Sequence, residues 1–183
     1  MSHEDGAASV LVVDDEERAA DTYANVLSAE YDTRTAYSGE EALDLAETAD
    51  FDVVLLDRRM PELTGDDVLA AIQQRAGDSR VAMVTAVTPD FDIVELGIDD
   101  YIVKPVGREN LHETVDRLLA LDAYDERQRE LSSLEVKRNV LELEKSAAEL
   151  KESDEFARLE RRIAELEAEL ADMAEDLDVP ERV

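Results

Sequence analysis

Short apolar runs alternate with amphipathic segments along residues 9–121. Runs rich in β-branched residues are typical of buried parallel strands, whereas apolar residues three and four positions apart, such as Ala20, Tyr23 and Leu27, mark one face of a helix. The pattern predicts five strands, at residues 9–14, 32–36, 52–57, 80–85 and 100–104, with helical segments between them. Because alternating strands and helices connect through right-handed crossovers, we expect an α/β fold with a five-stranded doubly wound parallel sheet.

Two of the predicted helices begin at recognisable capping residues. Ser38 precedes Glu41 by three positions, which is the spacing of a capping box, and Thr64 precedes Asp67 in the same way. Gly65 is interpreted as a turn glycine before the third helix. These signals place the starts of the second and third helices.

Beyond about residue 122 the glycine and strand signals end, and a heptad rhythm of apolar residues begins. A first seam consists of Val136, Val140, Leu143, Ala147 and Leu150. A second seam, out of register with the first, consists of Phe156, Leu159, Ile163, Leu166, Leu170, Met173 and Leu177. Because Ser153 between the seams is a suitable N-cap, we predict a helix over about 122–151, a turn at 151–154 and a helix over about 155–178.

Charge favours packing of these two helices against each other, as an α-helical hairpin or coiled-coil extension. Residues 136–151 carry four basic and three acidic side chains, whereas residues 154–178 carry ten acids and three arginines. A parallel homodimer through the second helix would bring Glu160, Glu167 and Glu169 close to their counterparts, which is unfavourable at low salt. We therefore expect an intramolecular antiparallel hairpin, with a long solvated helix as the alternative.

The chain of 183 residues has 44% hydrophobic residues, enough for a core, and a net charge of −29. Such a charge also suits a disordered chain, but here the acids are interleaved with apolar periodicity. Of the 19 basic residues, 15 are Arg and 4 are Lys. An acidic, lysine-poor surface is typical of proteins from salt-loving archaea, in which molar salt screens charges over ~3 Å. We favour that interpretation over an ordinary acidic protein.

Missing features narrow the classes of protein to consider. The chain has no cysteine, which excludes disulfides, thiolate metal sites and thiol catalysis. The acidic N-terminus lacks the pattern of a signal peptide, and no apolar stretch approaches the ~20 residues of a membrane span. We expect a cytoplasmic protein without membrane contact. The expected organisation is a disordered tail at 1–8, an α/β domain at 9–121, a helical domain at 122–178 and a tail at 179–183.

Five polar side chains follow the predicted strands. Asp14 and Asp15 follow the first, Asp57 the third, Thr85 the fourth and Lys104 the fifth. The carboxyl ends of parallel strands line one crevice, where ligands of open α/β sheets bind. Three carboxylates, a hydroxyl and an ammonium group at one edge suit a divalent cation and a phosphoryl group. Each residue alone is more simply a turn former, a helix cap or a surface charge, but their combination favours a site.

This group of side chains predicts phosphorylation of a carboxylate. A carboxylate is a poor nucleophile toward phosphorus because two anions repel, but Asp57 becomes competent when a cation neutralises the incoming phosphoryl oxygens. Mg²⁺ suits this role because it takes hard oxygen ligands and keeps several waters. We predict that Asp15 and Asp57 bind Mg²⁺ directly and Asp14 through water. Lys104 and Thr85 would contact phosphoryl oxygens of the resulting aspartyl phosphate.

Four strings surround these residues: Val12-Val13-Asp14-Asp15-Glu16, Leu55-Leu56-Asp57-Arg58-Arg59-Met60-Pro61, Val84-Thr85-Ala86 and Asp99-Asp100-Tyr101-Ile102-Val103-Lys104-Pro105. They resemble the receiver domain of two-component response regulators, the CheY-like family with a flavodoxin-like fold. The resemblance implies that Asp57 accepts a phosphoryl group from a sensor histidine kinase. It also implies a Mg²⁺ pocket formed by Asp14, Asp15, Asp57 and the backbone carbonyl of Arg59.

By the same resemblance Thr85 and Tyr101 are coupled switch residues, and the Lys104–Pro105 bond is cis. The resemblance implies self-catalysed phosphotransfer and autodephosphorylation rather than an enzyme, and it leaves open a homodimer on phosphorylation. One departure concerns the face that many relatives use to dimerise. Thr85 and Lys104 are 19 residues apart, shorter than is usual in the family. The fourth helix, at about 89–96, should therefore be short and that face altered.

The segment entered through residues 117–125 resembles the HalX-type C-terminal domain of haloarchaeal response regulators, which implies output in transcription regulation. Residues 125–183 carry 19 acids and 10 bases and show no helix-turn-helix signature. Because phosphate neutralisation supplies most non-specific affinity for DNA, we favour output through a protein partner. A direct DNA-binding transcriptional regulator is the alternative.

The residues alone leave two further classes of function open. A Mg²⁺-dependent phosphatase with an aspartyl nucleophile would have to use Asp14 with Glu16 at the first strand, and no substrate cap is evident. A structural coiled-coil adaptor with an inactive receiver would not need all five site positions filled. His3 and His112 lack partners at metal-ligand spacing, and the pair Arg58–Arg59 either steers the kinase or is solvated.

Overall fold

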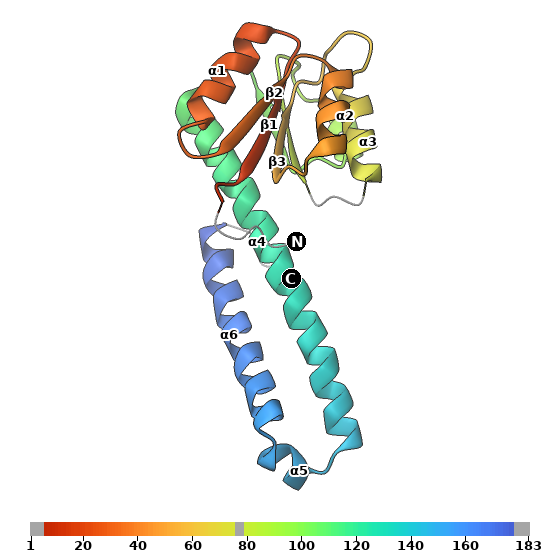
Figure 1. Ribbon diagram of the computed structural model, residues 1–183, viewed down its shortest axis with the longest axis vertical. Coiled ribbons are helices and arrows are strands. Elements are labelled where there is room, and N and C mark those ends of the chain that lie inside the picture. Colours follow the sequence, from red (N-terminus) through yellow and green to blue (C-terminus); the bar gives the residue numbers. More distant parts are fainter. Residues whose placement is uncertain (1–5, 76–78, 178–183) are drawn as a thin grey trace. The chain divides into compact units, whose positions relative to one another are not determined.

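The computed structural model of the protein describes residues 6–75 and 79–177 (Figure 1). Of the two expected tails, residues 1–5, including His3, and residues 179–183 lie outside the described residues, and residues 6–8 precede the first strand without regular structure. The chain divides into two compact units, Met1–Leu119 and Ala120–Val183, close to the boundary expected after residue 121.

Five parallel strands form one sheet in the first unit, in the order β2-β1-β3-β4-β5. The strands are β1 (Ser9–Val13), β2 (Asp32–Ala36), β3 (Val53–Leu56), β4 (Arg80–Thr85) and β5 (Asp100–Val103). All four residues of the central strand β3 are buried, which explains why its apolar run shows no alternation. The predicted doubly wound parallel sheet is confirmed.

Helices cover both faces of this sheet. They are α1 (Glu17–Leu27), α2 (Gly39–Thr48), α3 (Gly65–Gln74) and the first turns of α4 (Arg108–Glu144). Figure 1 shows α2 and α3 together on one face and α1 on the other. Leu56, Val68 and Ile72 belong to the core under α2 and α3. Leu27 and Leu118 are completely buried outside that cluster, so each face of the sheet has its own apolar layer.

The predicted capping residues begin their helices. The Ser38 hydroxyl accepts a hydrogen bond from the Glu41 N–H at 3.1 Å. Thr64 and Asp67 form a complete capping box, in which each side chain accepts from the backbone N–H of the other. Two short-range sequence signals therefore place α2 and α3 correctly.

The expected fourth helix at about 89–96 is wrong in type and length. The connection between β4 and β5 contains only the 3₁₀ helix η1 (Phe91–Val94), capped by the Asp90 side chain, which accepts from the Phe91 N–H at 2.7 Å. Pro89 and Gly97 bound the segment, and both residue types interrupt helices. A 3₁₀ turn is the structure that so short a connection allows.

In the second unit the long helix ends earlier than predicted. Helix α4 stops at Glu144, the short helix α5 (Ala147–Glu152) follows, and α6 (Asp154–Asp176) begins at the predicted N-cap Ser153. Ser146 and Glu149 form a second capping box, in which the Ser146 hydroxyl accepts from the Glu149 N–H and the Glu149 carboxylate accepts from the Ser146 N–H. This box starts a new helix where the heptad pattern suggested continuity.

Helices α4 and α6 run antiparallel, as expected for the hairpin (Figure 1). Ion pairs join Arg127 to Glu169, Arg162 to Glu130 and Arg138 to Glu160, with the order reversed along α6. The apolar residues of α6 that face this interface are Ile163, Leu166 and Leu170, and all three are buried.

The apolar seam predicted on α4 is wrong. Val136, Val140 and Leu143 are 62%, 53% and 84% exposed. Residues two apart on a helix lie about 200° apart, so Val136 and Val140 point away from Arg138, which pairs with α6. Helix α4 is apolar on two sides, and α6 covers the side with Leu134 and Leu141, which are partly buried. Among the described residues, no helix has an apolar stretch sufficient to cross a bilayer.

Candidate functional site

The site lies at the carboxyl ends of the strands, and backbone hydrogen bonds hold its residues there. The Asp14 N–H donates to the Ala36 carbonyl at 3.1 Å, and the Asp57 N–H donates to the Val13 carbonyl at 2.8 Å. The Lys104 N–H donates to the Thr85 carbonyl at 2.8 Å. These bonds extend the parallel ladders one residue beyond the strands, so the side chains that follow the strands inherit the rigidity of the sheet.

Three carboxylates gather at this edge. Oxygens of Asp14, Asp15 and Asp57 all lie within 4.8 Å of one another, and within the described ranges no other such group of metal-ligating side chains occurs. Asp14 is 2% and Asp57 8% exposed, whereas Asp15 is exposed. A trio of hard oxygen donors with one side open to solvent fits a divalent cation such as Mg²⁺, which keeps some of its waters.

Lys104 completes the group from β5. Its Nζ lies 2.5 Å from Oδ2 of Asp14 and 3.5 Å from Oδ2 of Asp57. Burial raises the pKa of the Asp14 carboxyl above its usual range, because desolvation outweighs the hydrogen bonds from Lys104 and the Glu16 N–H. Burial alone would lower the pKa of Lys104, but its bond to Asp14 and the charge of Asp57 raise it on balance. Lys104 is therefore a cation held between two buried carboxyl groups.

Thr85 and Tyr101 meet the same backbone segment. The buried Thr85 hydroxyl accepts from the Val87 N–H at 3.3 Å, and the Tyr101 hydroxyl donates to the Val87 carbonyl at 2.8 Å. The two residues are thus connected through the backbone of one residue, Val87, in the loop between β4 and η1. A displacement of Thr85 would therefore move Val87, whose carbonyl accepts the hydrogen bond from Tyr101.

An open cavity of about 540 Å³ surrounds the acidic group. It is lined by Asp14, Asp15, Glu16, Asp57, Arg59, Thr85, Ala86, Val87, Thr88 and Lys104. Arg59 is exposed at this cavity, and its N–H donates to Oδ1 of Asp57 at 3.4 Å. The Lys104–Pro105 peptide bond is cis. The structure thus brings six of the predicted site residues to one cavity: Asp14, Asp15, Asp57, Arg59, Thr85 and Lys104. Tyr101 and Pro105 do not line it, and Tyr101 contacts the lining residue Val87.

Sequence reasoning missed the role of Arg58, whose side chain is only 15% exposed. Its guanidinium donates to both carboxylate oxygens of Asp66 on α3 and also pairs with Asp92 on η1. These carboxylates raise the pKa of Arg58 further above its usual range. Arg58 is therefore neither solvated nor free to steer a kinase, because its guanidinium is paired with Asp66 and Asp92. Both acids come from other elements, and only the fold brings them to Arg58.

Gly65 is also more than a turn glycine. It is the first residue of α3, and a Cβ placed there would lie 2.3 Å from the Asp57 carbonyl oxygen and 2.7 Å from the Arg58 Cα. The Gly65 N–H donates to the Arg58 carbonyl at 2.9 Å. The start of α3 therefore approaches the backbone of the acidic site more closely than any side chain would permit.

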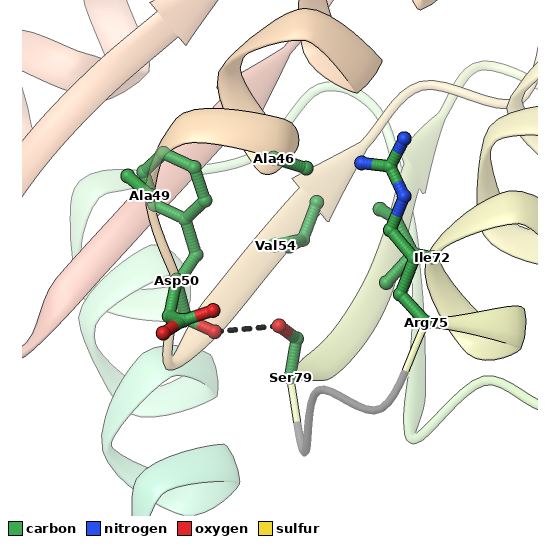
Figure 2. Close-up of a pocket in the computed structure, with 8 residues that line it drawn as sticks. Ala46, Ala49, Asp50, Val54, Ile72, Arg75 and Ser79 are labelled. Carbon is green, nitrogen blue, oxygen red and sulfur yellow. Dashed lines mark hydrogen bonds between the residues drawn. The ribbon is translucent and has the colours of Figure 1, made fainter. Parts of the chain in front are cut away.

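A second cavity, of about 260 Å³, opens at the opposite edge of the sheet (Figure 2). It is lined by Ala46, Ala49, Asp50, Phe51, Val54, Ile72, Arg75 and Ser79. Arg75 is engaged by the Leu43 carbonyl and by Glu47, and the Ser79 hydroxyl donates to the Phe51 carbonyl at 2.6 Å. This cavity has one carboxylate, that of Asp50, and the side chains of Arg75 and Ser79 are already hydrogen-bonded. It therefore lacks the cluster of carboxylates that makes the first cavity a candidate metal site.

Comparisons with known proteins agree with this geometry. The family model of the response regulator receiver domain matches residues 10–116, and that of the HalX domain matches residues 120–182. A Haloferax volcanii protein, named provisionally as a transcriptional regulator, is 51% identical over 134 residues, which cover 73% of this chain and 23% of that protein. The alkaline phosphatase synthesis transcriptional regulatory protein PhoP of Bacillus subtilis is 39% identical over 114 residues, 60% of this chain and 48% of the relative.

Among solved structures, the response regulator protein TrrA of Thermotoga maritima, in complex with Mg²⁺ and BeF, superposes with a TM-score of 0.56. It is 33% identical and covers 61% of this chain and 99% of its own. The match to each of the two curated relatives spans less than half of that relative's length. The similarity to solved structures therefore concerns the first unit, and the similarity to the Haloferax protein extends beyond it.

Proposed function

This chain belongs to the response regulator receiver family and carries a HalX domain after the receiver, and on that premise we propose that it is a phosphorylation-activated response regulator of a two-component system. Asp57 is the phosphoacceptor and a sensor histidine kinase is the donor. The observation that carries the proposal is the position of Lys104, whose ammonium group touches Asp14 and Asp57 beside the three clustered carboxylates.

The chemistry requires a carboxylate to attack a phosphorus atom. An oxygen of Asp57 forms the new bond to phosphorus while the bond from phosphorus to the donor histidine nitrogen breaks, and that nitrogen keeps the electron pair. Lys104 lies 3.5 Å from Asp57, where it can pair with a phosphoryl oxygen and offset the repulsion between the two anions. The Thr85 hydroxyl, at the end of the neighbouring strand, is the second donor at this edge.

The acidic group fits the metal that this reaction needs. We assign Asp15 and Asp57 as direct ligands of Mg²⁺, Asp14 as a ligand through water and the Arg59 backbone carbonyl as a further oxygen donor. When bound, Mg²⁺ supplies neutralisation of the phosphoryl charge. Positioning and charge neutralisation do most of the work in phosphoryl transfer, so the site needs no general acid or base, and the protein modifies only itself.

Transmission of the signal follows from the contacts of Val87. A phosphoryl group on Asp57 attracts the Thr85 hydroxyl, which in the present structure accepts from the Val87 N–H. Moving Thr85 shifts the backbone of Val87, whose carbonyl accepts a hydrogen bond from the Tyr101 hydroxyl. The loop between β4 and η1 is therefore the element that the phosphate biases. The HalX domain passes the signal to transcription through a protein partner, and direct binding of DNA is the second candidate.

The test is incubation of the purified protein with acetyl phosphate and Mg²⁺, read by intact-protein mass spectrometry. We expect one stable adduct of about 80 Da, which Asp57→Asn abolishes. Asp44→Asn, at an exposed acid of α2, is the matched control and should be modified like the wild type. An adduct that persists in Asp57→Asn, or repeated turnover of the donor with an unmodified protein, would overturn the proposal.

A further inference from the structure

The side of α4 that faces away from α6 carries an apolar stripe. We call the three exposed residues Val136, Val140 and Leu143 the outer stripe. Their spacing of four and three residues keeps them on one line along the helix. Three large apolar side chains in line, each more than half exposed, form a continuous patch rather than scattered surface residues.

The local charge makes this the place where two copies can approach. The whole chain carries −29, so most of its surface repels another copy of itself. Residues 136–151 carry four basic and three acidic side chains, a net +1, and three of the four lysines of the chain lie there. Lys137 and Glu144 flank the outer stripe and have no ion-pair partner within the described part of the chain.

We propose that the outer stripe is the contact surface for a second copy of this chain, with the two α4 helices antiparallel. Lys137 and Glu144 lie seven residues apart on the same flank of the stripe. In an antiparallel helix pair equal flanks face each other, so Lys137 meets Glu144 of the second copy and the reverse contact forms by symmetry. In a parallel pair they would face Ser132 and Asn139, which carry no charge.

Other occupants fit the stripe less well. The charge of −29 on the whole chain disfavours a nucleic acid or an anionic membrane surface, and neither of these would offer a cation to Glu144, whereas a second copy offers Lys137. The apolar residues of α6 already pack toward α4, since Ile163, Leu166 and Leu170 are buried. A self-complementary patch with one cation and one anion on the same flank is what a two-fold symmetric pair of helices needs.

The size of the patch sets the expected strength of association. Stable complexes bury about 800 Å² per partner, and three side chains supply only a part of that area. We therefore expect weak, reversible dimers, with a dissociation constant on the order of 100 µM for the isolated chain. Contacts elsewhere that hold two copies together would raise this affinity through effective concentration.

The first test is sedimentation velocity of the full chain without a phosphodonor, at molar salt and rising concentration. Salting-out conditions favour apolar contacts, so the wild type should shift from monomer to dimer. Leu143→Gln should abolish the shift, whereas Val94→Gln, at a residue 81% exposed on η1, should leave it unchanged. A wild type that stays monomeric at 1 mM, or a Leu143→Gln variant that dimerises normally, would overturn the proposal. Because no phosphate is present, this outcome is independent of the phosphorylation of Asp57.

The second test examines orientation, at the lowest salt at which the protein stays folded. Lys137→Glu and Glu144→Lys should each weaken the dimer about tenfold, because each creates two like-charge contacts across the two-fold axis. The double variant restores opposite charges and should recover the wild-type dissociation constant. Single variants without effect, or a double variant as weak as the singles, would rule out the antiparallel pair.

Discussion

Replacing Gly65 by alanine tests how closely α3 approaches the backbone of Asp57. The added Cβ would lie 2.3 Å from the Asp57 carbonyl oxygen and 2.7 Å from the Arg58 Cα. Both are backbone atoms, so no flexible side chain can yield, and the start of α3 must move. No glycine among the described residues has a positive φ, so the effect of this substitution is one of space rather than of backbone conformation.

The expected magnitude follows from three contributions. Overpacking of this kind costs about 1–3 kcal/mol. Displacing α3 also weakens the hydrogen bond from the Gly65 N–H to the Arg58 carbonyl, at about 1 kcal/mol. Alanine returns about 1 kcal/mol through its lower entropy in the unfolded chain. We expect a net loss of about 1–3 kcal/mol in the free energy of unfolding and slower phosphorylation, because the Asp57 backbone shifts with the helix.

Gly107→Ala is the matched control, since a Cβ at that position has nothing within 4 Å. Denaturant unfolding of both variants in molar salt, together with the rate of modification by acetyl phosphate, gives the comparison. If Gly65→Ala were as stable and as reactive as Gly107→Ala, the close approach of α3 to the site would be refuted.

Three further predictions concern charges. Lys104→Gln should slow modification by acetyl phosphate about 100-fold, because one preorganised cation at the phosphoryl oxygens is lost. Lys137→Gln, the control, should have no effect. An equal loss of rate in both variants would contradict the role assigned to Lys104. Mg²⁺ at ten times its dissociation constant should stabilise the wild type by about 1.4 kcal/mol, measured by thermal unfolding, and Asp15→Asn should lose most of this gain; equal gains would remove Asp15 from the ligand set. Burial and the hydrogen bond to Asp116 raise the pKa of Tyr31 above its ordinary value of 10. The folded state then keeps a proton that the unfolded state loses, so stability should fall as the pH rises above 10, and less steeply in Tyr31→Phe than in the wild type; equal slopes in the two proteins would refute this role.

Much of the first unit follows from short-range patterns. The apolar runs before Asp14 and Asp57 identify their strands because a buried parallel strand tolerates few polar residues. Parallel strands then bring their carboxyl ends to one edge, so the gathering of these side chains could be predicted without coordinates. The capping residues Ser38 and Thr64 bond to backbone N–H groups three residues further along the chain, so the helix starts are equally predictable from the sequence.

Other features of the site depend on residues far apart in the chain. Arg58 is held by Asp66 and Asp92, and nothing near Arg58 in the sequence indicates which acids it reaches. The requirement for Gly65 arises from the backbone of Asp57, across the loop between β3 and α3. Composition and residue spacing do not predict these contacts, because the residues come close to one another only in the folded chain.

The long helix α4 shows the division most clearly. The heptad spacing of the apolar residues predicts that residues 136–143 are helical, and the helical period places Val136, Val140 and Leu143 on one face. The sequence also contains a second apolar side, with Leu134 and Leu141. The side that meets α6 is known from the fold alone, where Arg127 and Arg138 form ion pairs with that helix. A local pattern can specify two apolar faces on one helix, but only packing against a second helix determines which of them is buried.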